Sequence, residues 1–210
     1  MNTGIIIAFL LAYLVGAIPS SVWVGKLFFG IDVRKYGSGN AGATNSFRVL
    51  GTLPGLVVLF ADITKGSIAV SFAYYIGGIL PFTDTFLYYK FSLGFTAALG
   101  HIFPVYLGFK GGKGVATFFG VVLAIFPLAA LICAIIFLTV FLLSRYVSLA
   151  SLVSSLAFPL AVLFLHRMFQ IPVIVFVCLI PVIIFYTHRK NIQRLMNGTE
   201  NKIRFKKSKP

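Results

Sequence analysis

Two glycine-rich segments hold the polar residues best suited to bind phosphate groups. Residues 37–48 read GSGNAGATNSFR, and residues 110–114 read KGGKG. Glycine lets successive backbone N–H groups point into one concavity, and a helix N-terminus adds partial positive charge. We expect phosphate contacts from Gly37, Ser38, Gly39, Asn40, Gly42, Thr44, Asn45, Arg48, Gly111, Gly112, Lys113 and Gly114.

Neither segment fits a nucleotide-binding motif. Residues 37–42 match GxGxxG, but no strand precedes the glycines, and Asp62, the candidate ribose-binding acid, lies in an apolar stretch. The second segment departs from a Walker A loop, because Leu107 and Gly114 stand where that loop needs Gly and Ser or Thr. The remaining alternative is that the glycines only turn the chain at a membrane boundary. A cation in each segment favours phosphate binding.

A second group of basic and polar residues comes later in the chain. Arg145 and Ser148 follow one apolar stretch, and the segment THRKN at 187–191 follows the last one. Guanidinium, imidazole, amide and hydroxyl groups together suit a phosphate ester. We therefore add Arg145, Ser148, His188, Arg189 and Asn191 to the candidate site.

Acidic residues are too few to support metal chemistry. The chain has four of them: Asp32, Asp62, Asp84 and Glu200. No two form a plausible pair for Mg²⁺ or for paired acid–base work. The two cysteines lie inside apolar runs and are typical of small buried hydrophobic residues. The sequence predicts a site without metal or cofactor.

The composition is that of an integral membrane protein. Of 210 residues, 59% are apolar and 10% are charged, whereas soluble domains have about 45–50% apolar and about 25% charged residues. The net charge of +14 comes from 18 basic and 4 acidic residues. On such a chain this charge indicates anionic lipid headgroups and anionic substrates as partners, and no nucleic acid.

Six apolar stretches are long enough to cross a bilayer in a helix. They are residues 3–25, 49–80, 91–109, 115–143, 146–165 and 168–187. Six spans would place the basic C-terminal tail opposite the basic loops, against the positive-inside rule. If residues 115–143 break near Pro127 into two short crossings, the chain has seven spans. The basic residues outside the spans then lie on the cytoplasmic side, except Lys90 and Arg167.

We therefore predict an all-α, polytopic membrane protein with seven transmembrane helices, the N-terminus outside and the C-terminus in the cytoplasm. Residues 1–187 form a single transmembrane domain with its active site on the cytoplasmic face. Residues 188–210 form a basic cytoplasmic tail, which begins with a motif that contributes to the site and contacts anionic lipid.

Three ionisable residues lie inside the predicted spans. Asp62 and Lys65 are one helical turn apart and can pair, which reduces the cost of burying each charge. We interpret the pair as support for the inner loops, with a direct functional role as the alternative. His101, beside Gly100, is more typical of helix packing than of a catalytic base.

At these residues the sequence resembles a known family, the bacterial integral-membrane acyl-phosphate:glycerol-3-phosphate acyltransferases of the PlsY type. Three segments carry the resemblance: GSGNAGATN with the following Arg48, GHIFPVYLGFKGGKGVAT at 100–117, and THRKNIQRLMNGTE at 187–200. Shorter matches are RYVSL at 145–149, where family members often have a second Ser at 147, and DITKG at 62–66.

The resemblance implies transfer of a fatty acyl group from acyl phosphate to the primary hydroxyl of glycerol 3-phosphate, giving lysophosphatidic acid and inorganic phosphate. It also implies seven spans, a site facing the cytoplasm in the bacterial inner membrane, no cofactor, and a structural role for Glu200. The HxxxxD box of other glycerolipid acyltransferases is absent, because Tyr106, Ile171 and Gln193 stand five positions after the three histidines.

An acyl phosphate has a good leaving group, so catalysis is mainly positioning and charge stabilisation. We expect catalytic roles for Ser38, Arg48, Lys113, His188 and Asn191. The base is either His188 or an oxygen of the donor's own phosphate, and which loop takes which phosphate is open. A covalent Ser38 acyl-enzyme lacks a triad. An anion or phosphate-ester transporter with the same basic pocket is the alternative function.

Overall fold

The computed structural model describes residues 3–203, which are helical or irregular and contain no strand. The all-α prediction is confirmed for this range. The chain forms two compact units, Met1–Pro127 (unit 1) and Leu128–Pro210 (unit 2). Part of the predicted basic tail, including Arg204, Lys206, Lys207 and Lys209, lies outside the described residues.

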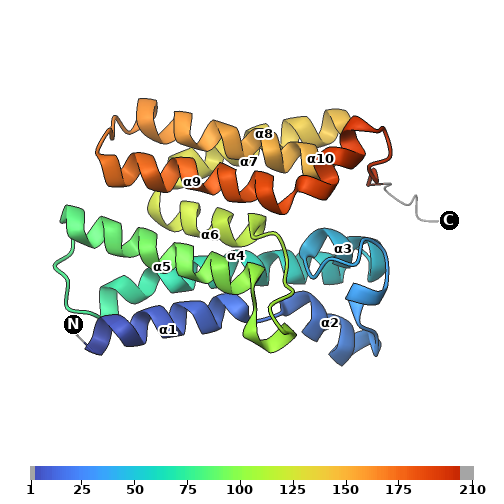
Figure 1. Cartoon of the computed structure of the whole chain (residues 1–210), viewed down its shortest axis with the longest axis horizontal. Helices are drawn as coiled ribbons and strands as arrows, with labels where there is room; N and C mark the ends of the chain where they lie inside the picture. The colour runs from blue at the N-terminus through green and yellow to red at the C-terminus, as the bar shows by residue number, and fades with distance from the viewer. Residues whose placement is uncertain (1–2, 204–210) are drawn as a thin grey trace. The chain divides into compact units, whose positions relative to one another are not determined.

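Unit 1 is a helical bundle with shorter segments at one end (Figure 1). Its elements are α1 (Thr3–Ala17), α2 (Ser20–Phe29), η1 (Val33–Lys35), α3 (Ala43–Val49), α4 (Thr52–Tyr75), α5 (Asp84–Ile102), η2 (Val105–Leu107) and α6 (Val115–Ile125). Helices α1, α4, α5 and α6 lie along one another, whereas α2 and α3 lie at one end of the unit.

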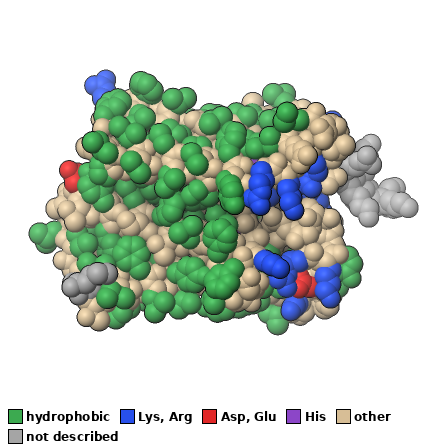
Figure 2. Space-filling model, in the orientation of Figure 1, with side chains coloured by type: hydrophobic (Ala, Val, Ile, Leu, Met, Phe, Trp, Pro, Cys, Tyr) green, Lys and Arg blue, Asp and Glu red, His purple; other side chains and the backbone are tan. Residues whose placement is uncertain are grey.

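Small residues allow these helices to approach closely. A Cβ added at Gly16 of α1 would overlap the backbone of Ala97 in α5, and one at Gly66 of α4 would overlap the carbonyl of Thr117 in α6. Lipid supplies no hydrophobic force between helices, so close backbone packing of this kind holds a membrane bundle together. In Figure 2 apolar side chains cover the visible face of these helices, and Lys and Arg gather at the end with α2 and α3.

Unit 2 contains α7 (Pro127–Ser144), α8 (Val147–Leu160), the π-helical turn η3 (Ala161–Leu165), α9 (Ile171–Thr187) and α10 (Arg189–Met196). Helix α8 packs along α9, and α10 turns away from α9 by 64° after His188. The turn places the polar segment after α9 beside the first residues of α8.

By length and composition, three helical segments among the described residues can cross a membrane: α4, α7 and α8 with η3. The number rises to five if α1 with α2, bent by 46°, and α9 with α10 each count as one span. Helix α6 is apolar but has only 11 residues. The expected break near Pro127 is confirmed: α6 ends at Ile125, and Pro127 begins α7, where its missing N–H costs nothing.

Two details differ from the prediction. The apolar stretch 3–25 is not one helix, because the chain breaks at Pro19 between α1 and α2. Lys90 does not lie in a loop before the helix of the stretch 91–109: it lies inside α5 and is only 9% exposed. Its amine lies 5.3 Å from the ring centre of Tyr74 and 3.3 Å from the Tyr74 hydroxyl, contacts that allow a cation to be buried.

Candidate functional site

The first glycine-rich loop of unit 1 is held in shape by the buried amide of Asn45. Its Oδ1 accepts hydrogen bonds from the Ser38 backbone N–H at 2.8 Å and the Ser38 hydroxyl at 3.1 Å. Its Nδ2 donates to the carbonyls of Val33 at 2.8 Å and Tyr36 at 3.2 Å. Asn45 is 1% exposed, so its amide binds the loop itself and is not offered to a ligand as the sequence suggested.

The same arrangement leaves other groups of the loop accessible. Gly37 and Gly39 adopt φ of +61° and +72°, a conformation that favours glycine, and Ser38 between them is exposed. Gly42 precedes the first turn of α3, Asn40 and Thr44 are half-buried, and Arg48 follows in the last turn of α3. Among residues 3–203, the N–H groups of Asn40 and Ala41 donate no hydrogen bond to another backbone group. The loop therefore keeps donors that suit an oxyanion.

Asn45→Asp is expected to destabilise unit 1, although the substitution replaces only an amide with a carboxylate of the same size. The new carboxylate oxygen would replace an amide that donates to the Val33 and Tyr36 carbonyls, so three acceptors would face one another. We expect a loss of about 1–3 kcal/mol in the free energy of unfolding, measured by thermal unfolding of the purified protein in detergent. Asn40→Asp, in the same loop but without these bonds, is the matched control. Equal stability of the two variants would contradict the role of Asn45.

The second glycine-rich loop uses its glycines for close packing. The N–H of Gly111 donates to the Ile102 carbonyl and that of Gly112 to the His101 carbonyl, each at 3.1 Å. A Cβ at Gly112 would overlap Nε2 of His101 and lie 2.9 Å from the Ala41 carbonyl oxygen. These two N–H groups are therefore not the phosphate donors that the sequence suggested. Lys113 is half-buried, and Gly114 (φ +82°) is the N-cap residue of α6.

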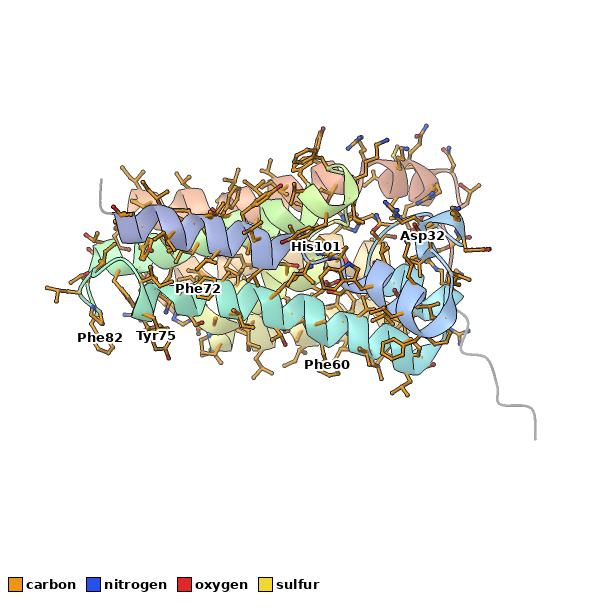
Figure 3. All side chains as sticks on the ribbon, turned by 90° about the horizontal axis from the view of Figure 1, so that it is seen from below. Asp32, Phe60, Phe72, Tyr75, Phe82 and His101 are labelled. Carbon is orange, nitrogen blue, oxygen red and sulfur yellow. The ribbon has the colours of Figure 1, made fainter. Side chains whose placement is uncertain are left out.

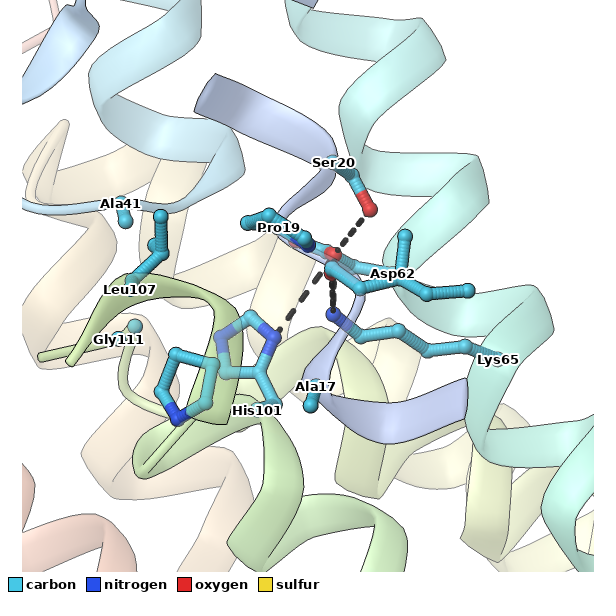
Figure 4. A pocket seen from close by; sticks show the side chains of 12 residues that line it. Ala17, Pro19, Ser20, Ala41, Asp62, Lys65, His101, Leu107 and Gly111 are labelled. Carbon is cyan, nitrogen blue, oxygen red and sulfur yellow. Dashed lines mark hydrogen bonds and ion pairs between the residues drawn. The ribbon is translucent and has the colours of Figure 1, made fainter. Parts of the chain in front are cut away.

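Asp62 and Lys65 pair inside unit 1, as their spacing predicts. The Lys65 Nζ and the Asp62 Oδ1 are 2.8 Å apart, and the two side chains are 5% and 2% exposed. The pair lies beside a cavity of about 10 Å³, roughly the space of one water molecule, which His101, Gly111 and Gly112 also line (Figure 4). In Figure 3 His101 lies in the interior, toward the end that carries Asp32, and Tyr75 and Phe82 lie at the other end.

Glu200 connects two helices of unit 2, α8 and α10. Its Oε1 accepts from the Ser148 hydroxyl in α8 at 2.8 Å and from the Asn191 amide in α10 at 2.6 Å. Its Oε2 lies 2.8 Å from Nε of Arg194. Ser148 and Asn191, which the sequence suggested as substrate ligands, are both buried against this carboxylate. The sequence analysis missed Arg194, because its pairing depends on the turn of the chain after α10.

His188 lies at the junction of α9 and α10 and is 3% exposed. Its Nδ1 is 2.8 Å from the Ile184 carbonyl. A carbonyl oxygen can only accept, so Nδ1 carries the proton and, in the neutral ring, Nε2 has the lone pair. The main chain of α9 thus fixes which nitrogen of His188 can accept a proton or bind a ligand hydroxyl.

Two other candidate residues of unit 2, Arg189 and Arg145, have contacts within the unit. The Arg189 guanidinium lies over the Tyr186 ring, 4.7 Å from its centre, and donates to the Tyr186 carbonyl. Arg145 has φ of +61°, and its carbonyl accepts from the Ile203 N–H at 3.0 Å. The backbone of Arg145 therefore connects the start of α8 to the chain after Glu200.

The stability of unit 2 should depend on pH through Glu200. Burial raises the pKa of this carboxyl, but hydrogen bonds from Asn191, Ser148 and Arg194 outweigh burial and hold the pKa below its ordinary value of 4.5. A lowered folded-state pKa adds stability that is complete above the unfolded-state pKa and is lost as the pH falls through the folded-state value. As the pH is lowered below about 4.5, the midpoint temperature of unfolding should therefore decrease. The decrease should be less steep in Glu200→Gln. Identical pH profiles would contradict this.

Comparison with known proteins identifies the family of this chain. A family model described as glycerol-3-phosphate acyltransferase matches residues 6–198. The chain belongs to the glycerol-3-phosphate acyltransferase family. It is 45% identical over 198 residues to the glycerol-3-phosphate acyltransferase of Fusobacterium nucleatum, covering 93% of this chain and 96% of that relative. It is also 45% identical over 212 residues to the enzyme of Enterococcus faecalis, covering 96% and 93% of the two chains.

Two solved structures resemble this acyltransferase family member over nearly its whole length. Both are crystal structures of PlsY, an integral membrane glycerol 3-phosphate acyltransferase. The glycerol 3-phosphate form has a TM-score of 0.85 and 37% identity over 95% of this chain and 96% of that one. The lysophosphatidic acid form has a TM-score of 0.81 and 36% identity over 95% of each chain. These comparisons give the transporter alternative no support.

Proposed function

We propose that this membrane glycerol-3-phosphate acyltransferase takes its acyl group from an acyl phosphate and releases lysophosphatidic acid and inorganic phosphate. The family supports the acceptor, because one solved relative is described in its glycerol 3-phosphate form and another in its lysophosphatidic acid form. The choice of donor rests on the phosphate-binding groups of the first glycine-rich loop. Exposed Ser38 and backbone N–H groups held in shape by Asn45 suit a phosphate on the donor as well as on the acceptor.

The reaction is an acyl transfer between two oxygens. The primary hydroxyl oxygen of glycerol 3-phosphate attacks the carbonyl carbon of the acyl phosphate, and the bond from that carbon to the bridging phosphate oxygen breaks. The hydroxyl proton ends on a phosphate oxygen, so the products are lysophosphatidic acid and inorganic phosphate. Since the leaving group is good, the protein has mainly to hold both substrates and stabilise negative charge.

The acidic residues support substrate phosphate as the final proton acceptor. Asp32 pairs with Arg34, Asp62 with Lys65, and Glu200 with Arg194. Asp84, the fourth, is exposed at the start of α5. Every carboxylate is thus paired or lies outside the candidate site, so the base is an oxygen of the donor phosphate, with Nε2 of His188 as the alternative.

Each unit contributes groups of its own to this proposal. In unit 1 the loop 37–48 would hold one phosphate with Ser38, Thr44 and Arg48, and Lys113 would bind a phosphate from the second loop. In unit 2 Nε2 of His188 would bind glycerol 3-phosphate. Ser148 and Asn191 would act mainly by fixing the segment around Glu200, which their buried hydrogen bonds support.

We further propose seven membrane spans, formed by α1, α4, α5, α6, α7, α8 with η3, and α9. The break at Pro127 supports the division of the long apolar stretch between α6 and α7. The N-terminus would lie outside and the C-terminus in the cytoplasm of the bacterial inner membrane. Both glycine-rich loops would then face the cytoplasm, where the basic residues contact anionic lipid headgroups.

One assay tests the function directly. The purified protein in detergent should release inorganic phosphate only when both acyl phosphate and glycerol 3-phosphate are present, and lysophosphatidic acid should form in equal amount. Acyl-coenzyme A in place of acyl phosphate should give no product. Turnover with acyl-coenzyme A alone as donor would contradict the proposed donor, and uptake of glycerol 3-phosphate into vesicles without product would contradict the acyltransferase.

A further inference from the structure

A buried polar cluster connects the break between α1 and α2 to α4 and α5. The Asp62 Oδ1 accepts from the Ser20 hydroxyl at 3.0 Å and from Lys65 Nζ at 2.8 Å, and it lies 3.7 Å from Nδ1 of His101 (Figure 4). Lys65 Nζ also donates to the Ile18 carbonyl at 3.1 Å. That carbonyl lies where Pro19 ends the regular helix, so Lys65 meets a backbone acceptor at the break.

His101 extends this cluster to both glycine-rich loops. Its ring has Nδ1 toward Asp62 and Nε2 against Gly112, where a Cβ would overlap the ring. Its backbone carbonyl accepts from the Gly112 N–H at 3.1 Å. The same side of Gly112 faces the Ala41 carbonyl of the first loop. His101 is therefore packed directly against the residue before Lys113, next to the segment that carries Ser38.

Stability alone does not explain such a cluster. Replacing a buried ion pair with apolar residues of similar volume is often neutral or stabilising, and ionisable groups inside a membrane are expensive. Directional contacts, in contrast, can fix the orientation of a ring. A displacement of about 1 Å in a substrate-binding group can cost a factor of about 100 in rate.

We propose that His101, packed between Asp62 and Gly112, is a positioning residue that sets the second glycine-rich loop, so that Lys113 reaches the phosphate it binds. The inference rests on the proposed function. His101 acts through Gly112 and Lys113 and makes no contact with substrate itself. Replacing His101 should therefore have the effect of a partial loss of Lys113. It should raise the KM of one substrate and not that of the other.

The test compares His101→Leu with Lys113→Ala in the phosphate-release assay. We expect His101→Leu to raise the KM of the same substrate as Lys113→Ala, by about 10- to 100-fold, and to leave the KM of the other substrate nearly unchanged. In the Lys113→Ala background the same change should cost less than about threefold, because the two residues act in one chain of contacts. His101→Asn, which keeps a polar side chain between Asp62 and Gly112, should restore most of the wild-type KM.

A second variant covers the possibility that His101→Leu does not fold. The double variant Asp62→Asn with Lys65→Met removes both charges together, so neither is left unpaired. It should show the KM defect of His101→Leu. A folded His101→Leu or double variant with wild-type KM values would overturn the proposal. Failure of both to fold would assign the cluster to stability alone and would overturn it too.

Lys90→Met is the matched control, since it removes a buried cation from the same helix, α5, away from the glycine-rich loops. Its KM values should equal those of the wild type. A KM defect like that of His101→Leu would show a general effect of disturbing α5 and would contradict positioning. Wild-type turnover is measured first: its absence contradicts the proposed function, whereas wild-type turnover with unaffected variants contradicts only the role of His101.

Discussion

His188→Gln is expected to raise the KM for glycerol 3-phosphate by about 10- to 100-fold, the equivalent of one hydrogen bond to a charged ligand. The reason is the fixed ring. Nδ1 donates to the Ile184 carbonyl, so Nε2 is the nitrogen that can accept from the ligand. If a donor phosphate oxygen takes the proton, kcat at saturating substrate should change much less than the KM. Steady-state kinetics with each substrate varied in turn measures both.

Two further variants make this result interpretable. His188→Asn keeps a donor near Nδ1 and lacks Nε2, so it should show the same KM defect with unchanged thermal stability. His166→Gln changes another histidine of unit 2, one without a proposed role, and should leave the kinetics unchanged. A collapse of kcat by about 100-fold or more in His188→Gln, rescued by added imidazole, would instead make His188 the base.

Glu200→Ala should cause the largest combined loss of stability and activity. The change removes the acceptor for the Ser148 hydroxyl and the Asn191 amide, both buried, and the partner of Arg194. Donors left unsatisfied in a buried position cost about 1–3 kcal/mol. Because the segment next to His188 loses its connection to α8, kcat/KM should also fall about 100-fold. Thermal unfolding and steady-state kinetics measure the two effects.

The neighbouring residue Arg194 provides the control. Its side chain is 37% exposed, so Arg194→Met removes only a partly solvated ion pair, worth up to about 1 kcal/mol. Glu200→Gln keeps one acceptor oxygen and should be intermediate. If Arg194→Met is as damaging as Glu200→Ala, the ion pair rather than the buried hydrogen bonds holds this segment, and our account of Glu200 is wrong.

The helical fold follows from the sequence because a chain in lipid must satisfy its backbone hydrogen bonds within each segment. The break at Pro127 is a local effect of proline and could be predicted. The break at Pro19 could not, since its flanks are apolar and the Ile18 carbonyl accepts from Lys65, which lies far along the chain. The burial of Lys90 could not be predicted for a similar reason, because its aromatic partner Tyr74 belongs to another helix.

In the candidate site, too, features set by neighbouring residues could be predicted, and features set by distant residues could not. The pairing of Asp62 and Lys65 is local to one helical turn and was predicted. Residue types also indicated phosphate chemistry in both glycine-rich segments. What the sequence could not give is the destination of each hydrogen bond. The Asn45 amide and the N–H groups of Gly111 and Gly112 have the right chemistry for a ligand but bind the protein instead.

The internal hydrogen bonds of Asn45 have a consequence for binding energy. The hydrogen bonds of its amide to Ser38 and to the carbonyls of Val33 and Tyr36 are made before any ligand arrives, so the first part of the segment 37–48 already has its shape. Little conformational entropy then remains to be lost when a phosphate binds. More of the contact energy can then appear as affinity for the phosphate group that the loop is proposed to bind.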